Sequence, residues 1–230
     1  MLYWNILDEK RIKLLKKLVN TLDLKNFYLG GGTGLSLQLG LRESVDFDFF
    51  TPNKFNNNII LDKLKSFNNA EITQNIEGTC DVLIDNIQTS FFYYPNKILD
   101  NFIISEELPN LQLASVLDIA VMKVAAISGR GAKKDFFDLY HILKSDRVTN
   151  EELIQGLFQK FGNKVNYRNI LMSLTYFEDA ENEKLPKCFV DNDWEKIKIF
   201  FNDISYYFEE NFIKILRNQN IKLNSSGEEM

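Results

Sequence analysis

Residues 30–50 decide the fold, and they read GGGTGLSLQLGLRESVDFDFF. A short apolar run at residues 27–29 precedes them and predicts a strand. The three glycines that follow have no Cβ, so the backbone can turn tightly there and approach a phosphate closely. We expect Thr33 to cap the element that follows the turn.

The segment from Leu35 to Leu41 fits two structures. Its leucines alternate along the chain, which is typical of a strand. Its short length, the insertion of Gln38 and the glycine turn before it leave a helix equally possible, with N-terminal amides facing an anion. We predict the helix.

Two carboxylates follow, one residue apart. Residues 45–50 alternate cleanly, and residues two apart on a strand face the same side, so Asp46 and Asp48 present their carboxylates together. A half-buried carboxylate pair costs free energy unless a cation is present, and Mg²⁺ binds carboxylates and substrate phosphates at once. An isolated Asp-x-Asp pair would more often be a solvated strand edge. The glycine turn beside it favours a metal-dependent nucleotidyl-transfer site.

Two ordered motifs resemble those of a known family. The first comprises Gly31-Gly32-Thr33, Arg42-Glu43-Ser44 and Asp46-Phe47-Asp48-Phe49-Phe50. The second, residues 114–143, reads ASVLDIAVMKVAAISGRGAKKDFFDLYHIL and carries Lys123, Arg130, Lys134-Asp135 and Asp138-Leu139-Tyr140. Together they resemble the AbiEii/AbiGii-type nucleotidyltransferase toxins, whose core is similar to DNA polymerase beta-like nucleotidyltransferases.

The resemblance implies an α+β fold. A nucleotidyltransferase-like core, with a mixed sheet and flanking helices, is expected over residues 1–110. A helical region over residues 111–230 would complete the active site and form a C-terminal extension. The last third of the chain shows no motif.

The resemblance also implies a function and a set of site residues. The protein would be a toxin of a toxin–antitoxin or phage-defence system that transfers a nucleotide from a nucleoside triphosphate to an RNA acceptor such as tRNA, with Mg²⁺ as cofactor and a cognate antitoxin protein as partner. The expected catalytic residues are Asp46, Asp48, Lys123 and Asp135, of which Asp46 and Asp48 hold the metal. The expected nucleotide-binding residues are Gly31, Gly32, Thr33, Arg42, Ser44, Arg130 and Lys134.

At one position the sequence departs from the family pattern in a way that bears on catalysis. Members of the family carry a third aspartate before a Tyr-Pro pair, where this chain has Ser90, which cannot replace a carboxylate as base or metal ligand. If residues 85–86 form a two-residue hairpin turn, Asp81 pairs with Ser90 and could supply the missing carboxylate to the metal. The alternative is a degenerate nucleotidyltransferase fold that binds nucleotide or RNA without chemistry. A surface for a partner protein alone would leave the carboxylate pair unexplained.

The cations of the second motif have two explanations. Lys123 interrupts an apolar helix, so its side chain either snorkels to the surface or reaches a phosphate. Arg130, Lys133 and Lys134 could bind nucleotide, or they could belong to a helix end where cations favour the macrodipole. For Lys123, the resemblance favours a contact with a phosphate.

Composition and charge argue against several other classes of protein. A net charge of −5 argues against a protein that coats nucleic acid by electrostatics alone. Cys80 and Cys188 are isolated, which argues against a zinc site or a disulfide framework, and the single His141 disfavours serine or cysteine hydrolase chemistry. No signal peptide or membrane span is evident, so we expect a cytoplasmic protein.

The rest of the chain gives a coarse pattern of elements. Pro95 is expected to end the sheet, Gly129 and Gly131 to separate two helices, and the polar tail from residue 218 to fray. Strands are predicted over residues 70–76, 79–84 and 87–94. Helices are predicted over residues 8–24, 58–67, 151–161, 166–180, 193–199 and 205–217.

Overall fold

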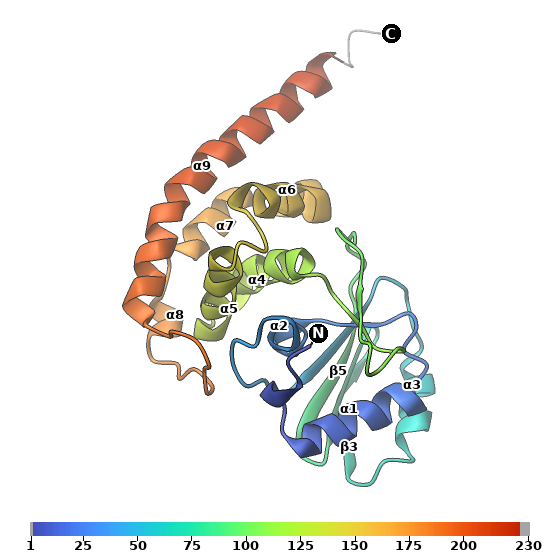
Figure 1. Ribbon diagram of the computed structural model, residues 1–230. Helices are drawn as coiled ribbons and strands as arrows, with labels where there is room; N and C mark the ends of the chain where they lie inside the picture. Colours follow the sequence, from blue (N-terminus) through green and yellow to red (C-terminus); the bar gives the residue numbers. More distant parts are fainter. Residues whose placement is uncertain (1, 226–230) are drawn as a thin grey trace.

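The computed structural model describes residues 2–225. These residues form a seven-stranded mixed sheet in the order β3-β4-β5-β2-β1-β7-β6, with helices on both faces (Figure 1). The strands are β1 (Tyr28–Leu29), β2 (Phe47–Thr51), β3 (Ala70–Ile76), β4 (Thr79–Ile84), β5 (Ile87–Tyr93), β6 (Ile103–Ile104) and β7 (Gln112–Leu113).

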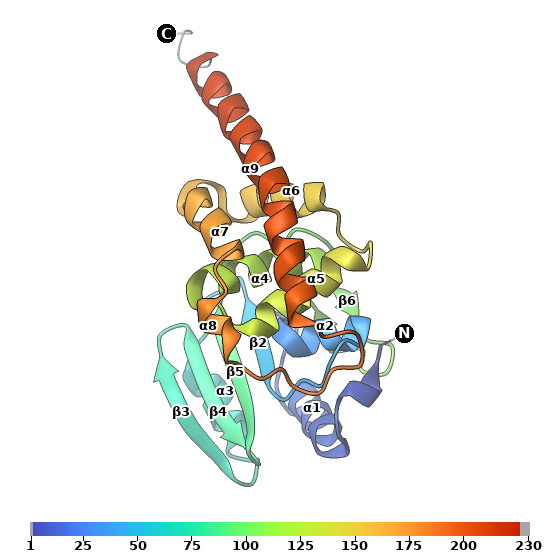
Figure 2. The ribbon, with the colours of Figure 1, turned by 90° about the vertical axis from the view of Figure 1, so that its left-hand side faces the viewer.

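The helices divide between the two parts of the molecule. Those before and within the sheet are α1 (Glu9–Thr21), α2 (Gly31–Leu39) and α3 (Asn57–Leu64). Those of the C-terminal helical region are α4 (Val116–Arg130), α5 (Lys133–Lys144), α6 (Asn150–Phe161), α7 (Tyr167–Leu174), α8 (Glu178–Glu181) and α9 (Trp194–Ser225). In two views α9 runs along the other helices of this region and projects beyond them (Figures 1 and 2).

The alternation predicted for β2 sorts its side chains between the two faces of the sheet. Phe47 and Phe49 are buried in one hydrophobic core with the inner faces of α1 and α3. Phe49 stacks on Phe91 of β5, with ring centroids 5.4 Å apart. Asp48, between the two phenylalanines, therefore faces the opposite side of the sheet, toward α2 and α4.

Helix α2 lies between two hydrophobic cores, which explains why its sequence resembles a strand. Leu35 belongs to the core built around α4 to α9, whereas Leu37 belongs to the core beneath the sheet. A short helix that is buried on two sides needs apolar residues at more positions than an amphipathic helix does. The helix prediction for this segment is confirmed, and Gly40 ends it with a left-handed φ of 66°.

The β4–β5 hairpin has the predicted register. Asp85 and Asn86 form the two-residue turn, with φ values of 50° and 64°, as a type I′ turn requires. Asp81 is consequently paired with Ser90. The parallel pairing of β2 with β5 places Ser90 directly beside Asp48.

Several element predictions were wrong for identifiable reasons. Pro95 does not end the sheet, because the two-residue strands β6 and β7 follow it and β7 pairs with β1. Strands this short carry no sequence period, and they extend the sheet past the predicted boundary at residue 110. Gly129 lies inside α4, which ends at Gly131.

The C-terminal helices also differ from the prediction. The two segments 193–199 and 205–217 belong to the single helix α9, because no helix-breaking residue separates them. That helix continues to Ser225, so the fraying predicted from residue 218 is not seen, and the rest of the predicted tail lies outside the described residues.

A buried ion pair joins two helices of the helical region, and its carboxylate also binds the loop that leaves the sheet. Lys160 at the end of α6 donates to Asp118 in the first turn of α4 over 2.6 Å, and both side chains are almost fully buried. Asp118 also accepts from the backbone amides of Leu99 and Asp100 and from the hydroxyl of Ser115. One carboxylate thus fixes two helices and the loop that leaves β5.

This arrangement predicts an asymmetry between the two partners. Asp118→Ala should lower the free energy of unfolding by about 3–5 kcal/mol, because it leaves a buried lysine without its anion. Lys160→Met should cost less, because Asp118 keeps three hydrogen-bond donors. Urea denaturation measures both, with the exposed Glu77→Ala as control, expected within about 0.5 kcal/mol of the wild type. Equal losses for the two variants would contradict the asymmetry.

Candidate active site

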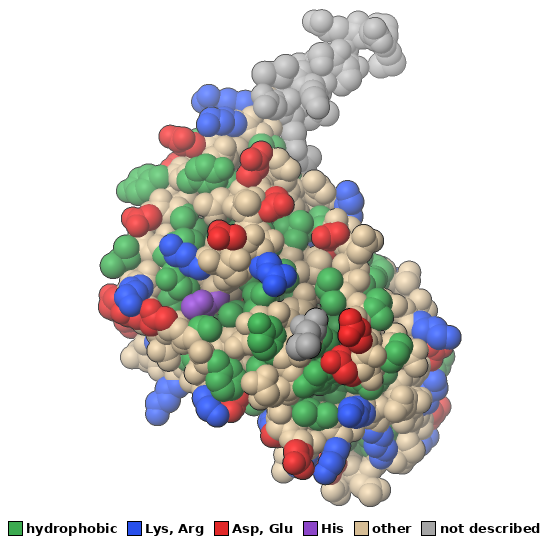
Figure 3. Space-filling model, viewed as in Figure 1, with side chains coloured by type: hydrophobic (Ala, Val, Ile, Leu, Met, Phe, Trp, Pro, Cys, Tyr) green, Lys and Arg blue, Asp and Glu red, His purple; other side chains and the backbone are tan. Residues whose placement is uncertain are grey.

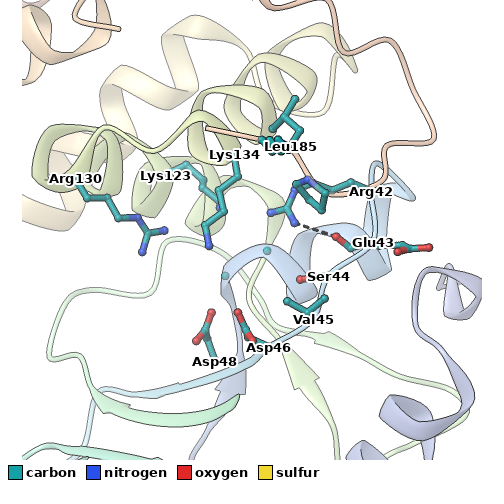
Figure 4. A pocket seen from close by; sticks show the side chains of 14 residues that line it. Arg42, Glu43, Ser44, Val45, Asp46, Asp48, Lys123, Arg130, Lys134 and Leu185 are labelled. Carbon is teal, nitrogen blue, oxygen red and sulfur yellow. Dashed lines mark hydrogen bonds between the residues drawn. The ribbon is translucent and has the colours of Figure 1, made fainter. Parts of the chain in front are cut away.

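The two sequence motifs meet in one cleft of about 450 Å³. The carboxylates of Asp46, just before β2, and Asp48, within it, lie on one wall, and cationic side chains from α4 and α5 lie on the facing wall (Figure 4). Its lining residues are Gly31, Gly32, Arg42, Glu43, Ser44, Val45, Asp46, Asp48, Lys123, Arg130, Lys134, Lys184, Leu185 and Pro186.

The glycine turn is itself the first turn of α2. Gly30 is the N-cap residue, and its amide donates to the carbonyl of Asp48 over 2.9 Å, which ties the helix start to β2. Gly31 has a φ of 58°, and a Cβ there would lie 2.3 Å from Oδ2 of Asp48. Only glycine therefore allows this approach, which leaves the first amides of α2 without intrahelical partners beside the Asp48 carboxylate.

Thr33 does not cap the helix as predicted, because it lies inside α2 and is buried. Its hydroxyl lies 2.7 Å from the hydroxyl of Ser44 and hydrogen-bonds the carbonyl of Asp46. Thr33 is not part of the cleft lining, whereas Ser44 is. Thr33 therefore holds the loop before β2 against the helix and so positions Asp46.

The carboxylate pair is electrostatically unfavourable without a cation. Burial raises the pKa of Asp48, and the charge of Asp46 raises it further. Lys123, Lys134 and Arg130 offset part of this effect. Among the described residues no group of three histidine, cysteine or acidic side chains could hold a metal, so an ion at this pair would draw its other ligands from water and phosphate oxygens.

A buried ion network supports the cationic wall. Asp138, fully buried on α5, accepts from Nε and Nη2 of Arg42 over 2.8 and 2.7 Å and lies 2.6 Å from Nζ of Lys123. Asp135, one turn earlier, lies 2.7 Å from the same Nζ and binds Nε of Arg130 over 2.8 Å. Burial alone would raise the pKa of both aspartates, but the neighbouring cations outweigh it and lower the pKa.

This network changes the interpretation of three predicted site residues. Lys123 neither snorkels nor stands free, because its Nζ is shared between two buried carboxylates. Asp135 faces cations of the protein, so it positions Lys123 and Arg130. Arg42 is bound bidentately to Asp138, which was not predicted as a site residue although it lies in the second motif.

Two cations of the cleft are not committed to such pairs. Lys134 and Lys184 line the cleft with exposed side chains, and neither forms an ion pair with any residue that the structure describes. Lys134 was predicted from the second motif. Lys184 was missed, because its segment carries no period or motif that could have marked it.

Lys184 belongs to a strap, residues 183–192, that connects α8 to α9. The strap is hydrogen-bonded to the segment before β2. The amide of Glu43 donates to the carbonyl of Lys187 over 2.8 Å, and the amide of Phe189 donates to the carbonyl of Leu41 over 2.9 Å. Nζ of Lys187 also lies 3.0 Å from a carboxylate oxygen of Glu43. The last third of the chain thereby forms one wall of the cleft.

Asp81 does not complete the carboxylate pair. Its pairing with Ser90 puts it on the same face of the sheet as Asp48, but Ser90 lies between them. Two strand spacings of roughly 4.8 Å separate the backbones of Asp48 and Asp81. Asp81 is not part of the cleft lining, and among the described residues it does not form a three-ligand metal-binding group with the pair.

Surface charge and hydropathy add two observations. On the face shown in Figure 3, acidic and basic side chains are interspersed, with no extended field of one sign. Within the described part of the chain, no helix combines the length and apolar character that a membrane crossing requires.

Comparison with known families matches residues 13–205 to the model described as "Nucleotidyl transferase AbiEii toxin, Type IV TA system". The match covers most of the chain and both motifs of the cleft. The chain belongs to the AbiEii toxin family. It is therefore a nucleotidyltransferase toxin of a type IV toxin–antitoxin system, a class that implies a nucleoside triphosphate substrate and a cognate antitoxin.

One protein is similar in sequence, and one solved structure is similar in fold. An uncharacterised protein of Aquifex aeolicus (strain VF5) is 34% identical over 197 residues, which span 85% of this chain and 94% of that protein. MenT4, a nucleotidyltransferase toxin from Mycobacterium tuberculosis H37Rv, has a similar fold, with a TM-score of 0.55 at 16% identity over 87% of this chain and 84% of MenT4. The predicted nucleotidyltransferase-like α+β fold is confirmed.

The ion network of this AbiEii-family protein predicts that Lys123→Met is destabilising. The substitution leaves the buried carboxylates of Asp135 and Asp138 facing each other's charge, and breaking a buried pair costs about 3–5 kcal/mol of unfolding free energy. Urea denaturation measures the loss, with the exposed Lys54→Met as matched control. A variant as stable as the wild type would show that Lys123 serves the substrate alone.

The raised pKa of Asp48 predicts that Asp48→Asn increases the stability of the metal-free protein, and that the increase depends on pH. Because the pKa is higher in the folded state, wild-type stability falls as pH rises from the ordinary value of 3.8 through the raised pKa. Asp48→Asn should therefore be more stable than the wild type at pH 7, and the difference should vanish below pH 3.8. Thermal melts in a chelator measure this, with Asp203→Asn on α9 as control. A constant difference across pH would contradict it.

Proposed function

We propose that this toxin transfers a nucleotide from a nucleoside triphosphate to an RNA acceptor, that the acceptor is a tRNA, and that the reaction depends on Mg²⁺. The observation that carries the proposal is that Asp46 and Asp48 line one cleft together with Lys134 and Lys184, which have no ion-pair partner among the described residues. Carboxylates that need a cation thus face cations that need an anion. A metal–triphosphate complex supplies both charges.

The residues of the cleft fit the metal that the family implies. Asp46 and Asp48 would hold Mg²⁺, and the pKa of Asp48 is raised by burial and by the charge of Asp46, as expected for a site that needs a cation. The ion would polarise the α-phosphate and stabilise the leaving pyrophosphate. Gly31 keeps the space beside Oδ2 of Asp48 free, since a Cβ would lie 2.3 Å from that atom.

The other cleft residues bind and orient the triphosphate. The free amides at the start of α2 and the hydroxyl of Ser44 lie on the carboxylate side and can donate to phosphate oxygens. Lys134 and Lys184 neutralise charge on the opposite side, where the buried network leaves them free to do so. Arg130 keeps one face toward the cleft while Asp135 fixes its guanidinium.

The chemical step is an in-line displacement at the α-phosphorus. A hydroxyl oxygen of the acceptor forms a bond to that phosphorus, the bond from phosphorus to the bridging oxygen breaks, and pyrophosphate leaves with the electron pair. The hydroxyl proton passes to water, because Ser90 occupies the position beside Asp48 where a carboxylate base would stand.

The proposal is tested by label transfer from each α-labelled nucleoside triphosphate into total tRNA, with Mg²⁺ or with a chelator. The wild type should transfer label only with Mg²⁺. Asp46→Asn and Asp48→Asn should reduce the rate on the order of 100-fold or more while the protein stays folded, because each removes a ligand charge from the transition state. Glu77→Gln, on the exposed β3–β4 turn, is the control.

Nucleotide binding separates catalysis from the alternative of a degenerate fold. A wild-type protein that binds nucleoside triphosphate with Mg²⁺ but transfers nothing to any RNA would support binding without chemistry. Transfer at the wild-type rate by Asp48→Asn would contradict the assignment of the metal to this pair.

Two lysines of the strap, Lys184 and Lys187, allow the contact with the triphosphate to be tested against a matched control. Lys184→Ala should raise the KM for the nucleoside triphosphate about tenfold, as should Lys134→Ala, because each removes a charged donor to phosphate. Lys187→Ala should leave that KM unchanged, because Lys187 is outside the cleft lining and is paired with Glu43. Similar KM values for Lys184→Ala and Lys187→Ala would exclude Lys184 from the site.

A further inference from the structure

A second cavity, of about 400 Å³, meets the catalytic cleft at Asp48. The two cavities share Gly31, Asp48, Lys123 and Arg130 and otherwise differ in their lining. The rest of the cleft lining comes mainly from the loop before β2, the strap and Lys134 of α5. The second cavity, here called the aromatic slot, is lined beyond the shared residues mainly by Phe50, Phe92, Tyr93, Tyr94, Met122 and Ala126.

The sheet register builds the aromatic side of the slot. The parallel pairing of β2 with β5 sets Phe50 beside Phe92, and their rings stack with centroids 5.2 Å apart. Tyr94 packs edge-on against Phe50 at 5.7 Å. Met122 and Ala126 of α4 also line the slot. All of these side chains are only partly buried, so ring surface remains accessible between the sheet and the helix.

The chemistry of the slot suits a flat aromatic ring and does not suit a phosphate. Apart from the residues that it shares with the cleft and the buried Asp135, the slot presents aromatic rings, methyl groups, a thioether and the hydroxyls of Tyr93 and Tyr94. Unstacked bases at the ends of single-stranded RNA are bound by such aromatic side chains, largely without regard to sequence.

We propose that the aromatic slot binds a nucleobase, and that this base belongs to the terminal nucleotide of the RNA acceptor. The inference rests on the proposed function. The donor triphosphate occupies the cationic cleft, and an in-line displacement requires the attacking oxygen to lie opposite the leaving pyrophosphate. The acceptor therefore approaches Asp48 from the side away from Lys134 and Lys184, which is the side of the slot.

Two substitutions test the slot from its opposite walls. Phe92→Ala removes a stacking surface, and Ala126→Phe fills the slot without removing any core side chain. Each should raise the KM for total tRNA about tenfold, measured at saturating nucleoside triphosphate, and should leave the KM for nucleoside triphosphate unchanged. Tyr206→Ala, an exposed aromatic on α9, is the control and should change neither KM.

The outcomes separate this inference from the proposed function. Wild-type protein that transfers no label would overturn the proposed function itself. Active variants with both KM values unchanged would overturn the slot and leave the proposed function intact. A rise in the KM for nucleoside triphosphate alone would show that the donor base occupies the slot and would overturn the acceptor assignment. If Phe92→Ala fails to fold by circular dichroism, Ala126→Phe decides among the same outcomes.

Discussion

The ion network around Asp138 is the interaction on which the rest of the site depends. It joins Arg42 from the loop before β2 to Lys123 of α4 through a single carboxylate of α5. Two consecutive helices are thereby held to a loop that lies far before them in the sequence. Because charges buried in this way are tolerated only when they are paired, the sheet and the helical region cannot separate without exposing unpaired ions.

Local patterns predicted most of the elements but not how the chain packs. The register of the β4–β5 hairpin followed from one turn, because a two-residue loop leaves a single way to pair its strands. Asp46 and Asp48 line the same cleft, as the alternation predicted, although Asp46 lies in the loop just before β2. The strands β6 and β7 could not be predicted, because two residues carry no period and their pairing depends on β1, which is far away in the sequence.

A site residue could be predicted from the sequence where its residue type alone indicates what it binds. It could not be predicted where an ion-pair partner within the protein determines its role. The carboxylate pair indicates a cation and the glycine turn indicates a phosphate, and both are visible in the sequence. Lys123 and Arg42 line the cleft, but their cationic groups are held by the buried partners Asp135 and Asp138. Lys184 lies in a strap without a motif, so only the backbone hydrogen bonds at Glu43 and Phe189 bring it to the cleft.

The strap has a consequence for when the protein can become active. It contributes Lys184, Leu185 and Pro186 to the wall of the cleft, and it is anchored to the segment before β2 by hydrogen bonds that reach Phe189. A nascent chain that has exposed the sheet, both carboxylates and α5 still lacks that wall. The toxin's cleft is therefore completed only after the strap has emerged from the ribosome.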